Sequence, residues 1–445
     1  MTGPTAYHRL TMTIAPTGTP APITGRLPDE AFDALVAVLD EIRLGRATSR
    51  AELVTRTGLG RAIVAQRVGE LIDRGLIIEG EVGPSTGGRP PRRLALRADA
   101  GHLLVADIGA TSIDVALTSL DGRILAHHDE PAQVEAGPEA CLGRVVELFD
   151  VLAASTPSIP GRLWGVGVAV PGPVEFRTGR PISPPIMPGW DGFPIRETYV
   201  ARYGAPVWVD NDVNVLALGE WRSGVAAGHD DLVVIKVGTG IGAGIISGGR
   251  LHRGAQGSAG DVGHIQVVDD RTVICRCGNV GCLEALAGGA AIGRAGEQAA
   301  LAGHSDRLMA AIDLRGTVTA ADVARAASHG DPFAVGILEA AGRRIGAMLA
   351  SVVNFFNPSL IVVGGGVANS PDLFLGSIRE TVYGRSLPLA TRDLRIERSS
   401  LGGQAGVIGA SAMVVDQLFA REAIADWIEV GQPAALALGM VGTAA

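Results

Sequence analysis

The chain has 445 residues, of which 47% are hydrophobic and 19% are charged, and its formal net charge is −8. That length accommodates about three domains of ordinary size, and no apolar run approaches the roughly 18 residues that a membrane-spanning helix requires. The first residues show no basic segment followed by an apolar core and a cleavage site, which excludes an evident secretory signal. Together with Cys141, which has no obvious partner for a disulfide, these features predict a soluble cytoplasmic protein that binds no membrane.

Positive charge gathers in one stretch of this acidic chain. Between Arg43 and Arg97 there are eleven arginines and five acidic residues, a balance of +6, so the remainder carries −14. A basic segment on an acidic body favours a polyanionic partner, which we expect to be nucleic acid. Lys236 is the only lysine; we attribute this to a coding bias toward arginine and assign the residue no function.

The N-terminal quarter reads as an arm followed by helices. Residues 1–26 are rich in Thr, Pro, Gly and Ala and lack apolar periodicity, so we expect a flexible arm. From Asp29, apolar residues recur at the three-and-four spacing of one buried helix face: Phe32, Leu35, Val36, Leu39 and Ile42. Ser49 and Glu52 have the spacing of a capping box, which predicts a second helix that stops near Gly58.

A third helix is predicted over residues 61–74. Its apolar positions predict a buried face made of Ile63, Val64, Val68, Leu71 and Ile72. Its outer face is expected to show Arg61, Ala62, Ala65, Gln66 and Arg67. Two short helices joined by a glycine-containing turn form a helix-turn-helix, whose second helix enters the major groove of DNA. There, Gln66 could pair with adenine, and Arg61 with guanine or phosphate.

A basic hairpin is expected to follow these helices. Residues 76–79 and 94–96 read as strands, and the run between them contains Arg89 and Arg92, placed to touch phosphate or the minor groove. We therefore predict a winged helix-turn-helix DNA-binding domain over residues 27–98, with operator DNA as its partner. The alternative is a small helical interaction module, which the arginine bias and the wing disfavour.

Three buried strands of the remaining chain end in glycine turns. The first runs into Asp107, Gly109 and Thr111. The other two run into the turns formed by Gly238, Thr239 and Gly240 and by Gly364, Gly365 and Gly366. Such turns can hold phosphate oxygens on backbone amides, and Asp107 could hold magnesium through water. The pattern is typical of the nucleotide cleft of the sugar-kinase and actin type, so residues 99–420 are predicted to form a two-lobed, ribonuclease-H-like α/β body.

Another strand, beginning at Val207, leads into Asp210-Asn211-Asp212. This arrangement would place carboxylates and an amide at the edge of a cleft, where Asp212 could accept a proton from a sugar hydroxyl as a general base. Alternatively, Asp210 to Asn214 only cap a helix that begins at Val215.

A compact set of metal-ligating residues follows, consisting of His264, Cys275, Cys277 and Cys282. Three thiolates and one imidazole complete a tetrahedral zinc shell and leave no position for a reacting water, so the predicted zinc is structural. Gly278 and Gly281 would let the loop curl tightly around the ion. The alternative is three unrelated buried thiols and a hydrogen-bonded histidine.

This assembly resembles the ROK family of repressors and sugar kinases over about residues 30–420. The resemblance implies that Asn211 and Asp212 contact a sugar and that Asp212 is the base of any kinase reaction. It also implies sugar contacts from Asp261, His264 and Glu284, and places ATP on the three glycine turns. This chain departs from the family pattern at several positions. Asp261 replaces a longer glutamate, and Ala110 replaces a glycine, where it would crowd phosphates. Pro185, Ile186 and Met187 stand where sugar-binding members often carry asparagine.

Two functions are compatible with these features. The first is a sugar-responsive transcriptional regulator, expected to be a repressor of carbohydrate uptake or metabolism genes. It would act as a homo-oligomer, a dimer or a dimer of dimers, with structural zinc holding the loop of His264. The alternative is an ATP-dependent, glucokinase-like hexose kinase with an attached DNA-binding domain, which would also need Mg-ATP and could be bifunctional. A kinase needs no arginine-rich module, so the regulator is the more economical interpretation. We assign no function to the tail, residues 421–445.

Overall fold

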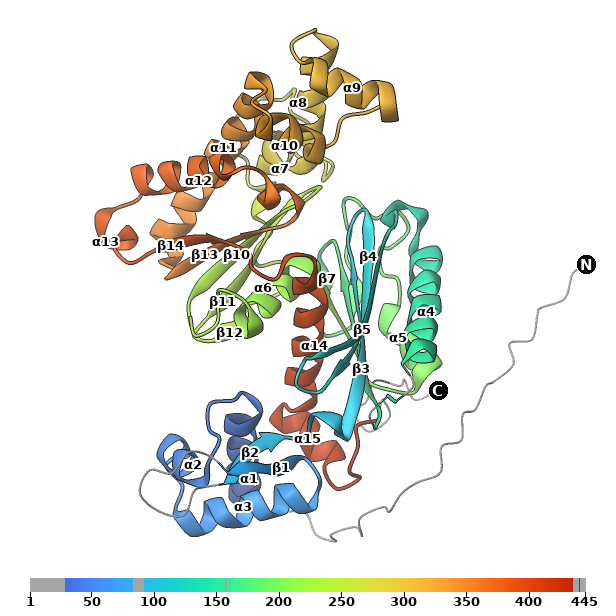
Figure 1. The fold of residues 1–445 in the computed structure, drawn as a ribbon, viewed down its shortest axis with the longest axis vertical. Helices are drawn as coiled ribbons and strands as arrows, with labels where there is room; N and C mark the ends of the chain where they lie inside the picture. Colours follow the sequence, from blue (N-terminus) through green and yellow to red (C-terminus); the bar gives the residue numbers. More distant parts are fainter. Residues whose placement is uncertain (1–28, 83–91, 157, 160, 435–439, 441–445) are drawn as a thin grey trace, which may run out of the picture. The chain divides into compact units, whose positions relative to one another are not determined.

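The computed structural model describes residues 29–82, 92–156, 158–159, 161–434 and 440 (Figure 1). The chain forms two compact units. The first contains the described residues up to Arg97 together with Trp427–Gly431, and the second contains Ala98–Asp426 and the described residues from Gln432 onward. The predicted arm and the loop with Arg89 lie outside the described residues. Within the described part, no helix combines the length and the apolar character needed to cross a membrane.

The first unit consists of helices followed by a hairpin, as predicted. Its elements are α1 (Asp29–Arg43), α2 (Arg50–Thr57), α3 (Arg61–Asp73), β1 (Ile77–Val82) and β2 (Arg92–Leu96). The two strands pair antiparallel, with Ile77 opposite Leu96. The helices enclose a small core in which Leu35, Leu53 and Leu71 are fully buried. The apolar periodicity therefore located these helices correctly.

Capping residues set the ends of α2. The Ser49 hydroxyl accepts a hydrogen bond from the Glu52 amide at 3.3 Å. The Glu52 carboxylate accepts a hydrogen bond from the Thr48 amide at 2.6 Å, one residue before the N-cap Ser49. At the other end, Gly58 has φ 71°, a left-handed conformation that glycine adopts without strain and that ends the helix.

The predicted phase of α3 is wrong at two positions. Arg67, expected on the outer face, is only 5% exposed, and its guanidinium pairs with Glu70 at 2.6 Å. Ile63, expected to be buried, is 44% exposed. The ion pair with the acid one turn later holds Arg67 along the helix surface, so its aliphatic stem covers apolar neighbours. Arg61, Ala62, Ala65 and Gln66 are exposed, as predicted.

The second unit contains two sheets with the same plan. One has the order β5-β4-β3-β6-β9 and the other β12-β11-β10-β13-β14. In each, three antiparallel strands are extended by two parallel ones. The strands of the first sheet are β3 (Gly101–Ile108), β4 (Ser112–Ser119), β5 (Ile124–Pro131), β6 (Arg162–Val170) and β9 (Val207–Asn211). Those of the second are β10 (Leu232–Val237), β11 (Ile241–Ser247), β12 (Arg250–Leu251), β13 (Leu360–Gly364) and β14 (Arg395–Arg398).

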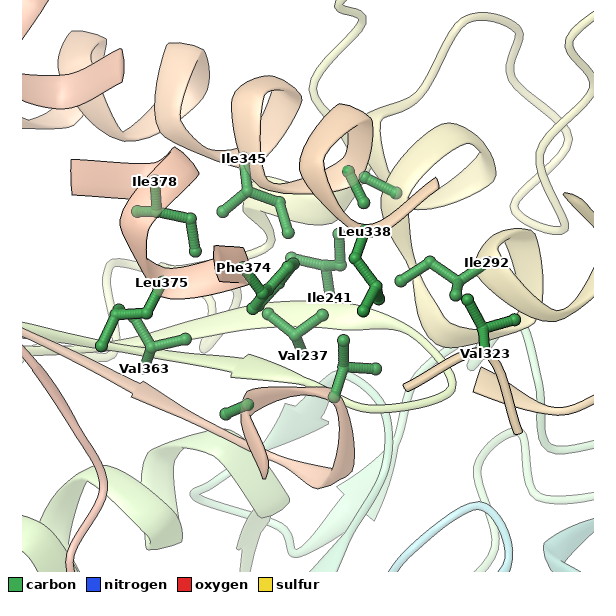
Figure 2. Close-up of a cluster of buried hydrophobic side chains, with 14 of the residues drawn as sticks. Val237, Ile241, Ile292, Val323, Leu338, Ile345, Val363, Phe374, Leu375 and Ile378 are labelled. Atoms are coloured by element: carbon green, nitrogen blue, oxygen red, sulfur yellow. The ribbon is translucent and has the colours of Figure 1, made fainter. Parts of the chain in front are cut away.

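Helices cover the outer faces of both sheets. The first sheet packs against α4 (Pro138–Ser155) and α5 (Ile195–Tyr203), and β7 (Val174–Glu175) and β8 (Arg180–Pro181) form a small hairpin nearby. The second sheet packs against α11 (Pro332–Phe356) and α12 (Asp372–Arg385). Figure 2 shows side chains of these two helices, including Leu338, Ile345 and Phe374, converging on Val237 and Val363 of the sheet. Alternating apolar strands and helices thus produce the predicted α/β body.

Smaller helices extend the second lobe and complete the chain. They are α7 (Leu283–Ala287), α8 (Gly289–Leu301), α9 (Asp306–Arg315), α10 (Ala320–Ser328), α13 (Pro388–Thr391) and α15 (Arg421–Trp427). Val323 of α10 joins the same core as Ile292 of α8 (Figure 2).

The inner faces of the two sheets are covered by a crossed pair of helices, α6 (Asp212–Ser223) and α14 (Ala405–Leu418). Their backbones approach each other at glycines: a Cβ added at Gly409 would stand 1.7 Å from the Val215 carbonyl oxygen, and one at Gly219 would stand 2.1 Å from that of Ala405. The helix α6 follows the first sheet in the chain but packs on the second, whereas α14 follows the second and packs on the first. The lobes are therefore joined by exchanged helices.

Candidate functional site

A cavity of about 730 Å³ lies in the second unit and collects most of the predicted sugar- and phosphate-contact residues. The sugar-contact candidates on its wall are Asn211, Asp212, Asp261, His264 and Glu284. The phosphate-contact candidates on its wall are Gly109, Thr111, Gly238, Thr239, Gly240 and Gly366. Ala110, Pro185 and Ile186 also line it, at the positions where the chain departs from the family pattern. Asp107, Gly364 and Gly365 do not line the cavity.

One wall of the cavity is the junction between β9 and α6. The helix begins at Asp212, with Asn211 as its N-cap. This start lies three residues before Val215, where the capping alternative placed it. The Asn211 side-chain oxygen Oδ1 accepts a hydrogen bond from the Val213 backbone amide at 2.9 Å, and its side-chain nitrogen Nδ2 donates to the Gly172 backbone carbonyl at 2.9 Å. Capping and exposure to the cavity therefore coexist in this segment.

Asp210 has a positioning role behind that wall. It is 1% exposed, and its carboxylate accepts from the Asn211 amide, from the Asn214 side chain at 2.9 Å and from Arg253 at 2.8 Å. The Arg253 guanidinium lies 3.8 Å above the ring of Phe176. A carboxylate with all these partners fixes the start of α6 and the orientation of its first residues.

Asp212 does not face the cavity as a free carboxylate. Its Oδ2 accepts a hydrogen bond from the Lys236 ammonium at 2.7 Å, and the side chains of the two residues are 9% and 20% exposed. Burial by itself lowers the pKa of Lys236, but the carboxylates of Asp212 and Asp107 outweigh that effect and hold this pKa above its usual value. Lys236 is consequently a protonated cation throughout the ordinary pH range.

Asp107 lies next to the last residue of β3 and is not a lining residue of the cavity. Its Oδ1 is buried and has no hydrogen-bond partner among the described residues, and a Cβ at Gly406 would stand 1.9 Å from its Oδ2. Burial, opposed by the charge of Lys236 and reinforced by that of Asp212, raises the pKa of Asp107 to about 6. The sequence predicted this carboxylate but not the lysine that accompanies it.

The wall also carries Glu284, at the start of α7. Its Oε2 accepts a hydrogen bond from the Ile241 amide at 3.0 Å, and a Cβ at Gly240 would stand 2.3 Å from the same oxygen. The glycine turn after β10 thereby orients this carboxylate toward the cavity. A ring of hydrogen-bonding side chains around a concave, partly apolar cavity is suited to a small polyhydroxylated ligand.

The predicted metal ligands come together at one edge of the cavity. The ligand atoms of His264, Cys275, Cys277 and Cys282 all lie within 4.8 Å of one another. The Cys277 and Cys282 sulfurs are 3.8 Å apart, and the Cys275 sulfur is 3.7 Å from His264 Nδ1. Sulfurs bound at about 2.3 Å to a tetrahedral ion stand about 3.8 Å apart, so the residues fit zinc.

Local backbone structure supports that cluster. The Cys275 amide donates to the Asn279 carbonyl at 2.8 Å, and Gly278 and Gly281 both have positive φ, 88° and 71°. A Cβ at Gly281 would stand 1.9 Å from the Val268 carbonyl oxygen, so only glycine fits there. Burial raises the pKa of Cys282 to about 12, with its sulfur neighbours adding to the shift, so a bound cation is what would make this thiol a thiolate. His264 belongs to both the cluster and the cavity wall.

Three comparisons place these features among known proteins. A protein-family model described as the ROK family matches residues 104–417. The xylose repressor of Caldicellulosiruptor bescii is 32% identical over 384 residues, which cover 86% of this chain and 95% of that protein.

Two solved structures are similar to the fold. A ROK family transcriptional regulator, homologous to the E. coli MLC protein, superposes with a TM-score of 0.72 at 28% identity and covers 90% of this chain and 98% of its own. A ROK family glucokinase from Streptomyces griseus, in complex with glucose and AMPPNP, has a TM-score of 0.62 at 33% identity. That match covers 70% of this chain and 99% of the glucokinase.

Proposed function

Because the chain belongs to the ROK family and carries a basic helical unit ahead of the matched residues, we propose that it is a sugar-responsive DNA-binding transcriptional repressor of carbohydrate uptake or metabolism genes. The observation that carries this proposal is the extent of the similarity. The matches to the repressor and to the regulator span 86% and 90% of this chain. The match to the glucokinase spans 99% of the glucokinase but only 70% of this chain. Nearly the whole length of a glucokinase thus aligns with only part of this chain, so a kinase of this family does not require the basic unit.

In this proposal, the first unit is a winged helix-turn-helix that binds operator DNA. The helices α2 and α3 are joined by a short turn through Gly58, and the leading face of α3 exposes Arg61, Ala62 and Gln66. The exposed Ile63 adds an apolar group of the kind that contacts a thymine methyl. The hairpin of β1 and β2 serves as the wing, with Arg92 64% exposed beside Glu79. Arg67 takes no part, because it is buried.

The cavity of the second unit is the proposed sugar site, with contacts from Asn211, Asp212, Asp261, His264 and Glu284. These residues line one cavity, and the match to a glucokinase in complex with glucose supports a sugar as its occupant. The metal cluster is proposed to hold a structural zinc, which ties the loop of His264 to the cavity wall. Binding to two half-sites of a pseudo-palindrome would require a dimer or a dimer of dimers.

Operator release by sugar tests the repressor proposal directly. Duplexes that the protein selects from a randomised pool would be titrated by fluorescence anisotropy, with and without D-xylose or D-glucose. To move the operator from nearly full to nearly empty, the sugar must favour the non-binding state by about 10⁴-fold. We expect one sugar to weaken operator binding strongly and mannitol, the open-chain control, to leave it unchanged. A protein that binds no duplex would contradict the proposal.

Substitution of Arg61 by alanine should weaken binding to the selected duplex by about 1–3 kcal/mol if the guanidinium contacts a base. A phosphate contact would instead weaken binding to all sequences and reduce the salt dependence by roughly one counterion. Arg177→Ala is a matched control, because Arg177 is an 83% exposed arginine of the second unit. Equal affinities of the two variants would show that α3 is not the recognition helix.

A further inference from the structure

The sole lysine of the chain stands in the candidate sugar site. Lys236 is on β10, where its register neighbours are Gly242 on β11 and Gly364 on β13. Because these two neighbours have no side chains, the lysine can extend across the sheet toward the start of α6. A Cβ at Gly242 would stand 2.9 Å from a Val213 methyl, which confirms that this face of the sheet packs on that helix. The sheet is thus built to direct one long cationic side chain at Asp212.

The ammonium is bonded to the carboxylate that a kinase of this architecture would need as its general base. A general base must offer a free carboxylate to the sugar hydroxyl, but the Asp212 carboxylate is bound to Lys236 at 2.7 Å. A hydrated magnesium ion next to Asp107, whose buried Oδ1 has no hydrogen-bond partner among the described residues, would meet a fixed positive charge, because the Lys236 ammonium is held 2.7 Å from Asp212 and its charge also acts on Asp107. The residues at this position therefore do not fit Mg-ATP.

We propose that Lys236 is an internal counter-ion that turns the cleft into a receptor: its ammonium neutralises Asp212 and excludes a divalent cation from Asp107, so sugar is bound but not phosphorylated. This inference rests on the proposed sugar site and extends it to the chemistry that happens there. A bound sugar that is not consumed reports its own concentration and needs no ATP. That behaviour suits an effector of operator binding.

The competing interpretation is that Lys236 swings away from Asp212 and holds the phosphates of ATP. The two interpretations differ in what the unmodified protein does with a divalent cation. An internal counter-ion keeps the cation out, whereas a phosphate-binding lysine leaves the carboxylates available once nucleotide and metal arrive together.

Binding of Mn²⁺, as a probe for magnesium, distinguishes these interpretations. The parent protein, Lys236→Met and Lys236→Arg would be titrated with Mn²⁺ by electron paramagnetic resonance, with zinc kept at saturation. We expect Lys236→Met to bind Mn²⁺ at least about tenfold more tightly than the parent, because one unit of positive charge is removed beside two carboxylates. Lys236→Arg, which keeps the charge, should resemble the parent. The added site should disappear in Lys236→Met combined with Asp107→Asn.

Several outcomes would overturn the inference. Equal Mn²⁺ affinity of the parent and Lys236→Met would show that the ammonium excludes nothing. Sugar-dependent ADP release by the parent protein would show that Asp212 is a working base. If Lys236→Met does not fold, the inference is tested on the parent protein alone. Tight Mn²⁺ binding by the parent, or ADP release with D-xylose or D-glucose, would contradict it. Operator release by sugar is measured separately. If the parent protein does not bind Mn²⁺ and sugar does not change its operator affinity, only the repressor proposal is contradicted.

Discussion

Replacement of Cys277 by serine is expected to release the zinc ion and to destabilise the second unit, while Cys141→Ser leaves zinc binding unchanged. A serine hydroxyl stays protonated and is a poor zinc ligand, whereas the proposed tetrahedral shell would use three thiolates and His264. Loss of a direct ligand should lower zinc affinity by more than the roughly 10–100-fold typical of an outer-shell partner. The measurement is zinc content by mass spectrometry after dialysis, followed by thermal unfolding.

The stability change follows from the affinity change. A ligand present at about 100 times its dissociation constant stabilises the folded state by about 2.7 kcal/mol, and this contribution is lost when the ion no longer binds. Chelation of the parent protein should lower its midpoint of unfolding toward that of Cys277→Ser. Cys141 is a fair control because it is also buried, at 4% exposure, but lies in α4 and donates to the Gln133 carbonyl. If Cys277→Ser retains full zinc occupancy, the metal cluster is assigned wrongly.

Replacement of Gly409 by alanine should be among the most damaging single-methyl additions in the chain. The new Cβ would stand 1.7 Å from the Val215 carbonyl oxygen and 2.8 Å from the Gly219 amide nitrogen, and both of these contacts are backbone atoms of α6 that cannot rotate away. Overpacking usually costs about 1–3 kcal/mol and occasionally more. We expect a loss at or above the top of that range, measured by urea unfolding.

Gly376→Ala is the matched control for this substitution. Gly376 also lies within a helix, α12, but an added Cβ there would have no atom within 4 Å other than those of its chain neighbours and the adjacent backbone of its own helix. Replacing an unhindered helical glycine by alanine stabilises a protein by roughly 0.5–1 kcal/mol. The two variants should therefore shift the unfolding midpoint in opposite directions. A neutral Gly409→Ala would mean that α6 and α14 can separate at little cost.

Local patterns were sufficient to predict much of the fold and most of the candidate cavity. The glycine turns after β3, β10 and β13 were evident because a buried apolar strand followed by glycines has few other interpretations. The ligands of the metal cluster were evident because the three cysteines fall within eight residues. Both signals are short in sequence, so no knowledge of distant neighbours was needed to find them.

The errors and omissions concern side chains whose surroundings come from elsewhere in the chain. Lys236 was noticed as the only lysine but was given no role, because its target Asp212 is 24 residues away and its path depends on glycines in two other strands. The signal that could have identified this role is the position of Lys236 in the sequence, one residue before the end of its strand and next to a glycine turn. The prediction for Arg67 is wrong because charge predicts exposure, whereas this side chain is buried and its guanidinium pairs with Glu70 at 2.6 Å, with the Nε left without a hydrogen-bond partner among the described residues.

The exchange of α6 and α14 between the lobes has a consequence for folding. Neither sheet can cover its inner face with a helix from its own half of the chain, since α6 packs on β10 and β11 while α14 packs on β3 and β6. The inner face of the first sheet therefore becomes buried only after α14, from the second half of the chain, has been added. Contacts of such long sequence separation slow folding and couple the two halves. The body should consequently unfold in one cooperative transition, and neither half should persist as a folded fragment.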